Sequence, residues 1–269
     1  MTTPPSHPPS NRPAERESQP TPGSVPRVQA AREAGDGSDA EGVGKSAEGV
    51  RGGRPPREDR WTLSHAIGRM TSVSVLRAFF GFRAYHPERI PATGPALIVA
   101  NHQSFLDPIA IGGPVTQRQL SYLARAGLFT HPLAGRLLRS FHAVPIRENT
   151  GDASAIREIL RRLQEGDAVV VFPEGSRSPD GEVHEFKRGI ALLIKRARCP
   201  VVPVAIEGAF EAWPRHRKWP RLLGGRIRSL YAEPIPYDEL MKDGPDAALD
   251  RLRRIIVEMC QTLRAMDAR

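Results

Sequence analysis

The segment NHQSFLDP at residues 101–108 holds a histidine and an aspartate five positions apart, His102 and Asp107. A carboxylate that holds one imidazole nitrogen leaves the other nitrogen available to take a proton from a hydroxyl group. In such a pair the alcohol of a substrate would replace the serine of a catalytic triad. His102 and Asp107 are therefore the candidate catalytic pair for acyl transfer to an alcohol.

The pair can meet only if the chain between its members is not a regular helix, because an offset of five residues places two helical side chains roughly 140° apart. We expect a buried strand at residues 96–100 and a loop that contains His102. A helix should follow, with Asp107 as its cap and Pro108 at its first position. The alternative is that Asp107 only caps this helix and that His102 is a surface loop residue.

A phosphate-binding function is indicated by the segment FPEGSRS at residues 172–178. It follows an expected strand at residues 168–172, and ligands of open α/β sheets bind at the carboxyl ends of strands. Backbone amides and the Arg177 guanidinium would suit a phosphate. Glu174 cannot serve that purpose by its own charge, so we assign it to orienting neighbouring groups or to the hydroxyls of a glycerol.

Further cations stand at expected strand ends and helix starts. Arg147 ends the segment AVPIR, and Lys187 precedes an expected helix start at Gly189. Together with Arg177 they could complete a cationic pocket. Each of these cations taken alone would be read as a solvated surface charge, whereas their joint placement favours a binding site for an anion.

Strand-like and helix-like stretches alternate along most of the chain. Short apolar runs rich in Val and Ile predict strands at residues 96–100, 120–124, 143–146, 168–172, 201–206 and 227–231. Apolar residues at helical spacing predict helices at residues 152–164, 187–197 and 245–266. This alternation is typical of an α/β domain.

The first 60 residues differ in composition from the rest of the chain. They contain no Phe, Trp, Tyr, Leu or Ile and are rich in Pro, Gly and Ser, so they cannot bury enough apolar surface to offset chain entropy. We expect a disordered tail over residues 1–60. Its charges balance, so the formal excess of +9 lies on residues 61–269. A basic folded part favours nucleic acid, an anionic membrane surface or phosphorylated substrates.

Residues 61–82 are the nearest candidate for a membrane-associated segment. His65, Arg69 and Arg77 interrupt its apolar run, so it does not qualify as a spanning helix. An apolar stripe at helical spacing, closed by aromatic residues, would suit a lipid interface. The alternative is an ordinary core helix that packs on a sheet. The stripe is Leu63, Ile67, Met70 and Val73, and the aromatic residues are Phe79, Phe80 and Phe82.

Targeting and metal-binding signals are absent from the sequence. The N-terminus has no apolar core flanked by positive charge, so we expect no secretory signal peptide. The two cysteines, Cys199 and Cys260, have no paired spacing, so we expect neither a zinc site nor a disulfide framework. A reducing cytoplasmic setting fits these features.

The segments NHQSFLDP, AVPIR, FPEGSRS and CPVVPVAI, in this order, resemble the sequence blocks of the 1-acylglycerol-3-phosphate acyltransferase family, within the wider glycerolipid acyltransferases. The resemblance covers roughly residues 89–236. It implies a mixed sheet flanked by helices, with a membrane-interfacial helical segment at residues 61–88 and the acyltransferase domain at residues 89–269. Many bacterial members carry an N-terminal pair of helices that dips into one leaflet, at the place of residues 61–82.

The resemblance also implies roles for individual residues. His102 and Asp107 match the catalytic pair of the family, and Arg147 matches an arginine that contacts the glycerophosphate. Pro203 in the fourth block would lie near the acyl-donor side. Arg125 stands where many members have a lysine, which keeps the charge and changes the geometry of the cation. The acceptor-binding residues of the third block, in which serine replaces the usual threonine, correspond to Glu174, Gly175, Ser176 and Arg177.

The implied reaction transfers an acyl group from acyl-CoA or acyl carrier protein to the free hydroxyl of 1-acyl-glycerol-3-phosphate and forms phosphatidate. No metal or cofactor is expected, and the expected location is the cytoplasmic face of an anionic membrane, as a peripheral or monotopic protein. No binding of nucleic acid is expected, because no recognised motif is present. The alternatives are another lysolipid or glycerol 3-phosphate as acceptor, or a non-catalytic lipid-phosphate-binding protein. A serine hydrolase is disfavoured because Ser176 does not complete a GxSxG elbow.

Overall fold

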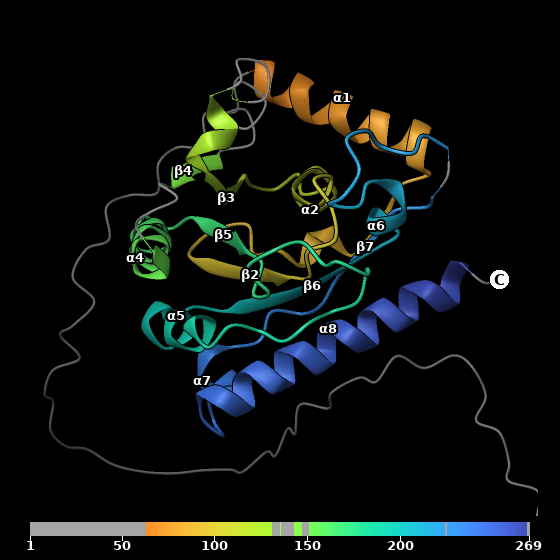
Figure 1. Ribbon diagram of the computed structural model, residues 1–269. Helices are drawn as coiled ribbons and strands as arrows, with labels where there is room; N and C mark the ends of the chain where they lie inside the picture. Colours follow the sequence, from red (N-terminus) through yellow and green to blue (C-terminus); the bar gives the residue numbers. More distant parts are fainter. Residues whose placement is uncertain (1–62, 131–134, 136–142, 147–150, 224, 268–269) are drawn as a thin grey trace, which may run out of the picture. The chain divides into compact units, whose positions relative to one another are not determined.

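The computed structural model describes residues 63–130, 135, 143–146, 151–223 and 225–267. Within them, a seven-stranded sheet carries helices on both faces (Figure 1). This architecture confirms the predicted α/β fold class. The expected tail at residues 1–60 and the predicted site residue Arg147 lie outside the described residues.

The sheet contains every strand that the apolar runs predict, and one more. The order across the sheet is β1-β7-β6-β2-β5-β3-β4. Strand β7 is antiparallel to β6, and the other neighbouring strands are parallel. The additional strand, β1, has only three residues and no apolar run, so its pairing with β7 defines it. The strands are β1 (Arg83–Tyr85), β2 (Ala96–Ala100), β3 (Leu120–Arg125), β4 (Ala143–Ile146), β5 (Ala168–Val171), β6 (Val201–Glu207) and β7 (Arg228–Tyr231).

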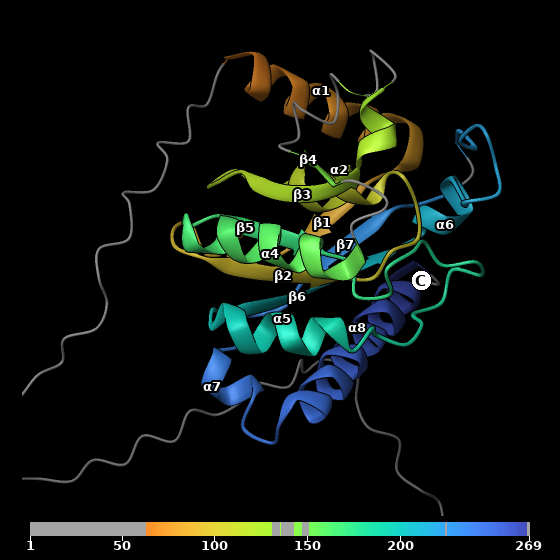
Figure 2. The same ribbon diagram turned by 60° about the vertical axis from the view of Figure 1, so that its left-hand side comes forward.

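Two groups of helices cover the two faces of the sheet (Figures 1 and 2). One face carries α1 (Leu63–Phe80) and α2 (Asp107–Gly112). The other face carries α4 (Gly151–Gln164), α5 (Gly189–Ala197) and α8 (Pro245–Asp267). The shorter elements are α6 (Ala209–Ala212), α7 (Tyr237–Leu240) and the 3-10 turns η1 (Pro87–Arg89) and η2 (Ala126–Phe129).

Strand β2, with the sequence ALIVA, is apolar at every position because both of its faces are covered. All of its residues are fully buried. Ile98 packs in the cluster that includes α1 and α2, whereas Leu97 and Val99 pack in the cluster that includes α4, α5 and α8. Since side chains alternate across a strand, two covered faces require a continuous apolar run.

Helix α1 divides its apolar residues between a packed face and an open face. Val73, Leu76 and Phe80 are buried in the core cluster, while Ile67 and Met70 are 54% and 63% exposed. Ile67, Met70 and Val73 do recur on one side of a helix, as predicted. The structure buries Val73 against the core and leaves Ile67 and Met70 exposed. Among the described residues, no helix is both long enough and apolar enough to cross a membrane.

The carboxyl ends of β2, β5 and β6 meet at one edge of the sheet, since the three strands are parallel and β2 lies between the other two. The segments that begin at Asn101, Phe172 and Gly208 leave the sheet there. This edge is where ligands of open α/β sheets bind. The predicted catalytic and phosphate-binding segments therefore come together.

Candidate active site

His102 and Asp107 form a hydrogen-bonded pair. The distance between His102 Nδ1 and Asp107 Oδ2 is 2.7 Å. The Asp107 side chain is fully buried, and that of His102 is 19% exposed. Because a carboxylate only accepts, the neutral imidazole carries its proton on Nδ1 and keeps a lone pair on Nε2. A general base that acts on an alcohol needs this arrangement.

The loop between β2 and α2 brings the pair together, as the sequence predicts. The backbone amides of Gln103 and Ser104 donate to Asp107 Oδ2 over 2.6 and 2.7 Å. The prediction that Asp107 caps the helix is wrong, because Asp107 is its first residue and Leu106 occupies the cap position without a side-chain bond. The carboxylate turns back toward the loop, where two amides and the imidazole supply three donors. Asp107 thus fixes the loop as well as the base.

Two neighbouring segments hold the same loop. Asn101 Nδ2 donates to Ile206 O over 2.9 Å, and Ile206 N donates to Asn101 Oδ1 over 2.8 Å. The amide of Ser178 donates to His102 O over 2.7 Å. The imidazole of His102 stacks on the ring of Phe172, with 3.9 Å between the centroids and 17° between the planes. The segments after β2 and β5, together with β6 itself, are therefore joined around the histidine.

Glu174 is buried directly beside this loop. Its Oε1 accepts a hydrogen bond from His102 N over 3.1 Å. Burial raises the pKa of Glu174 to about 7, against the opposing effects of the His102 amide and of His184. The contact places Glu174 where it can orient a neighbouring group, one of the two roles predicted for it. Contact with a glycerol hydroxyl stays a prediction.

Arg177 lies on an aromatic platform next to the catalytic loop. Its guanidinium carbon is 3.5 Å from the centroid of the Phe105 ring, and Phe105 packs against Trp213 with 5.3 Å between centroids. Ser104 Oγ donates to Trp213 O over 2.8 Å. Stacking orients the planar guanidinium, whose edge carries the N–H donors that suit a phosphate.

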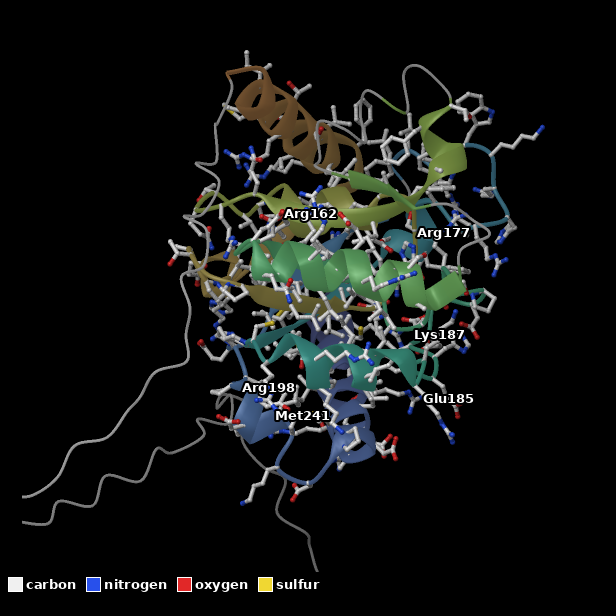
Figure 3. The ribbon with its side chains drawn as sticks, turned by 90° about the vertical axis from the view of Figure 1, so that its left-hand side faces the viewer. Arg162, Arg177, Glu185, Lys187, Arg198 and Met241 are labelled. Carbon is white, nitrogen blue, oxygen red and sulfur yellow. The ribbon has the colours of Figure 1, made fainter. Side chains whose placement is uncertain are left out.

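Lys187 passes over the turn at Gly175. The φ angle of Gly175 is +74°, and a Cβ added there would lie 2.6 Å from Lys187 Nζ. Only glycine combines this backbone conformation with so close an approach. Figure 3 shows Lys187 and Arg177 toward the same end of the strands, opposite Arg198. The two predicted cations therefore belong to one edge of the sheet.

For the other predicted site residues, the structure gives a position in the fold and leaves their roles untested. Ser176 is exposed on the loop after β5, and Pro203 is buried within β6 opposite Val99. Arg125 is the last residue of β3, and its side chain is not among the described ones. The roles of Pro203 on the acyl-donor side and of Arg125 and Arg147 at the phosphate stay predictions. Within the described residues, no group of three or more His, Cys, Asp or Glu could hold a metal ion.

The part of the chain that holds the His–Asp pair is similar to known proteins. A family model described as Acyltransferase matches residues 81–207, which include the His–Asp pair and the FPEGSRS segment. The chain is 30% identical over 156 residues to the 1-acyl-sn-glycerol-3-phosphate acyltransferase of Bacillus subtilis (strain 168), a match that covers 58% of this chain and 74% of that one. The chain belongs to the 1-acyl-sn-glycerol-3-phosphate acyltransferase family.

Other members of the 1-acyl-sn-glycerol-3-phosphate acyltransferase family match between 49% and 79% of their own length. The Homo sapiens alpha protein is 31% identical over 172 residues, 61% of this chain and 58% of its own. For the chloroplastic protein of Arabidopsis thaliana the identity is 26%, and the match spans 49% of that protein. The crystal structure of the 1-acyl-sn-glycerophosphate acyltransferase PlsC from Thermotoga maritima is similar with a TM-score of 0.62 and 25% identity, and the match covers 75% of this chain and 79% of that one.

Three contacts of this acyltransferase-family site are not predicted from the sequence. They are the stacking of Phe172 on the imidazole, the pairing of Asn101 with β6, and the platform of Phe105 and Trp213. Phe172 and Asn101 stand inside the motifs, so the sequence does contain a signal for their place in the site. Trp213 lies outside every motif, and only the fold brings it to Phe105.

Proposed function

We propose that this protein transfers an acyl group from acyl-CoA or acyl carrier protein to the free hydroxyl of 1-acyl-glycerol-3-phosphate and forms phosphatidate. The observation that carries the proposal is the 2.7 Å bond between His102 Nδ1 and the fully buried carboxylate of Asp107. Proteins in the family to which this chain belongs are named as acyltransferases of 1-acyl-sn-glycerol-3-phosphate. A protein that only binds lipid phosphates would have no need for an oriented base.

His102 acts as the general base of the proposed reaction. Its Nε2 takes the proton of the acceptor hydroxyl while the hydroxyl oxygen attacks the carbonyl carbon of the thioester. The tetrahedral intermediate then collapses, the carbon–sulfur bond breaks, and the sulfur leaves as a thiol with the proton that His102 returns. Asp107 holds the imidazole in the required tautomer and stabilises the imidazolium. The reaction needs no acyl-enzyme and no resident cofactor, because the donor is consumed as a substrate.

The acceptor phosphate would bind at the loop after β5. The guanidinium of Arg177, stacked on Phe105, offers a planar edge for two hydrogen bonds to phosphate oxygens. Lys187 adds a second positive charge over the Gly175 turn. The other contacts that we propose for the acceptor are Arg125, Arg147, Glu174 and Ser176.

The acceptor is a lipid, so the protein would work at a membrane surface. Ile67, Met70 and Phe79 on α1 are exposed apolar side chains, which supports contact with a lipid interface. The formal excess of +9 supports an anionic leaflet. We therefore propose peripheral or monotopic association with the cytoplasmic face of a membrane.

Incubation of the purified protein with labelled acyl-CoA and a panel of acceptors tests this function. Labelled phosphatidate from 1-acyl-glycerol-3-phosphate is the expected product. Faster acylation of another lysolipid or of glycerol 3-phosphate would correct the proposed acceptor and still support acyl transfer. Free fatty acid alone would indicate a hydrolase, and the absence of both products would indicate a lipid-phosphate-binding protein.

A further inference from the structure

The loop between α6 and β7 carries a dense positive charge that the proposed chemistry does not use. Residues 214–223, called the basic loop below, read PRHRKWPRLL and contain no acidic residue. Their basic side chains are all exposed, and none forms an ion pair with a carboxylate of the described residues. The cations are Arg215, Arg217, Lys218 and Arg221.

The same loop exposes three large apolar side chains. Trp219 is 81% exposed, Leu222 is 54% exposed and Leu223 is 79% exposed. Leu223 also has a φ angle of +61°, a left-handed backbone conformation that is uncommon for residues other than glycine. Apolar residues that face water amid cations are typical of segments that bind a lipid interface.

The basic loop adjoins the C-terminal end of α1. Leu223 N donates to Phe79 O at the end of α1 over 3.0 Å, and Figures 1 and 2 both show the segment between α6 and β7 close to that end of the helix. Phe79 itself is 40% exposed, and Ile67 and Met70 lie exposed farther along α1. Exposed apolar side chains of the loop and of the end of α1 therefore lie close to one another.

The basic loop is also fixed to the rim of the candidate active site. It begins directly after Trp213, whose ring packs on Phe105 and whose carbonyl accepts the Ser104 hydroxyl. Trp213 Nε1 donates to Arg217 O over 3.1 Å, inside the loop. These contacts connect the start of the basic loop to the catalytic loop.

We propose that the basic loop is a second membrane-binding element, separate from α1. Its cations bind the anionic headgroups of a phospholipid leaflet, and Trp219, Leu222 and Leu223 enter the interface between headgroups and acyl chains. The loop thereby holds Phe105 and Trp213, at the rim of the site, next to the leaflet that supplies a lipid acceptor. This consequence for turnover rests on the proposed function, whereas membrane binding by the loop does not.

An acidic protein, such as an acyl carrier protein, is the other partner that the four exposed cations could bind. The membrane is favoured because an exposed tryptophan and two exposed leucines share the loop with the cations. Phe79 at the adjoining end of α1 adds further exposed apolar surface, which a bilayer covers and a small acidic protein does not require.

Cosedimentation of the full-length protein with vesicles tests the proposal without measuring turnover. The vesicles are phosphatidylcholine with or without phosphatidylglycerol. The variants are Arg217→Glu with Lys218→Glu, and Trp219→Ser with Leu223→Ser. Matched controls on the exposed face of α5 are Lys195→Glu with Arg196→Glu, and Leu192→Ser. We expect each loop variant to weaken binding to anionic vesicles about tenfold or more, while the controls bind as the unchanged protein does.

A second measurement follows tryptophan emission. The variant Trp61→Phe with Trp213→Phe keeps Trp219 alone, and its emission should shift to shorter wavelength on addition of phosphatidylglycerol vesicles. Equal vesicle binding by loop and control variants, together with an unshifted Trp219 emission, would overturn the proposal. A raised KM for acyl carrier protein donor with unchanged vesicle binding would identify the loop as a donor-binding surface instead. Vesicle binding that depends on the loop in a protein without acyltransferase activity would overturn the proposed function and leave the proposal intact.

Discussion

His102 is held in place from several directions. Asp107 binds its Nδ1, Phe172 covers its ring face, and its backbone is bonded to Glu174 and Ser178. A base that is fixed before the substrate arrives loses little conformational freedom during the reaction. At this scale the site is a set of short contacts around one imidazole. Two cations, Arg177 and Lys187, stand on the segment between β5 and α5.

The pKa of Glu174 makes stability depend on pH. Because burial raises it from 4.5 to about 7, the folded protein binds this proton more tightly than the unfolded chain does. The contribution to the free energy of unfolding is fully present below pH 4.5 and is lost as pH rises to about 7. We expect Glu174→Gln to gain stability relative to the unchanged protein across that window, by on the order of 1–3 kcal/mol. Denaturant unfolding at several pH values measures this, and a constant difference would contradict the assignment.

Substitution of Gly175 by alanine tests the proposed role of Lys187 in binding the acceptor. Alanine at Gly175 would place a Cβ against Lys187 and must also adopt a positive φ, whereas alanine at Gly166, with φ +88°, meets nothing within 4 Å. We expect both substitutions to cost about 1–2 kcal/mol of stability, which thermal unfolding measures. Only Gly175→Ala should also raise the KM for the acceptor, because it displaces the ammonium group. An equal acceptor KM in the two variants would show that Lys187 does not bind the acceptor phosphate.

Arg177 should act on the acceptor and not on the donor. Removal of its guanidinium in Arg177→Ala should raise the acceptor KM roughly tenfold or more, since charge-assisted hydrogen bonds to phosphate contribute about 1.5–3 kcal/mol each. Arg177→Lys should recover only part of the loss, because an ammonium cannot reproduce the planar edge stacked on Phe105. Steady-state kinetics with each substrate varied in turn measures both effects. A raised donor KM with an unchanged acceptor KM would reverse the assignment.

At the scale of elements, α1 combines both of the alternatives that its sequence left open. Its second half packs on the core through Val73, Leu76 and Phe80, as an ordinary core helix would. Ile67 and Met70 remain exposed, as an interfacial helix would require. Hydrophobic periodicity shows that a helix has an apolar side, but it does not show which part of that side meets protein.

The two faces of α1 should respond differently to substitution. Leu76→Ala removes buried volume and should lower the free energy of unfolding by about 2–5 kcal/mol. Ile67→Ser with Met70→Ser changes exposed side chains and should alter it by about 0.5 kcal/mol or less, while weakening binding to anionic vesicles. Denaturant unfolding and cosedimentation measure the two effects. A large stability loss in the double variant would show that these residues pack on protein.

At the scale of the whole molecule, the parallel strands β2, β5 and β6 collect segments that are far apart in the chain. The predicted strands and long helices agree closely with the structure, because apolar runs and helical spacing are local properties. The predicted meeting of His102 with Asp107 is also correct, since the loop between them is short. Strand β1, the cap position at Leu106 and the contact between Phe105 and Trp213 escaped prediction. They depend on pairing and packing partners that the sequence order does not reveal.

Turnover by His102→Asn, measured with acyl-CoA and 1-acyl-glycerol-3-phosphate, tests the central claim most directly. Asparagine keeps a donor for Asp107 but has no basic nitrogen, so kcat should fall about 100- to 10,000-fold while thermal unfolding stays close to that of the unchanged protein. His86→Asn is the matched control, because His86 is exposed and asparagine tolerates its φ of +63°. Turnover by His102→Asn within a few-fold of the control would contradict the assignment of His102 as the general base.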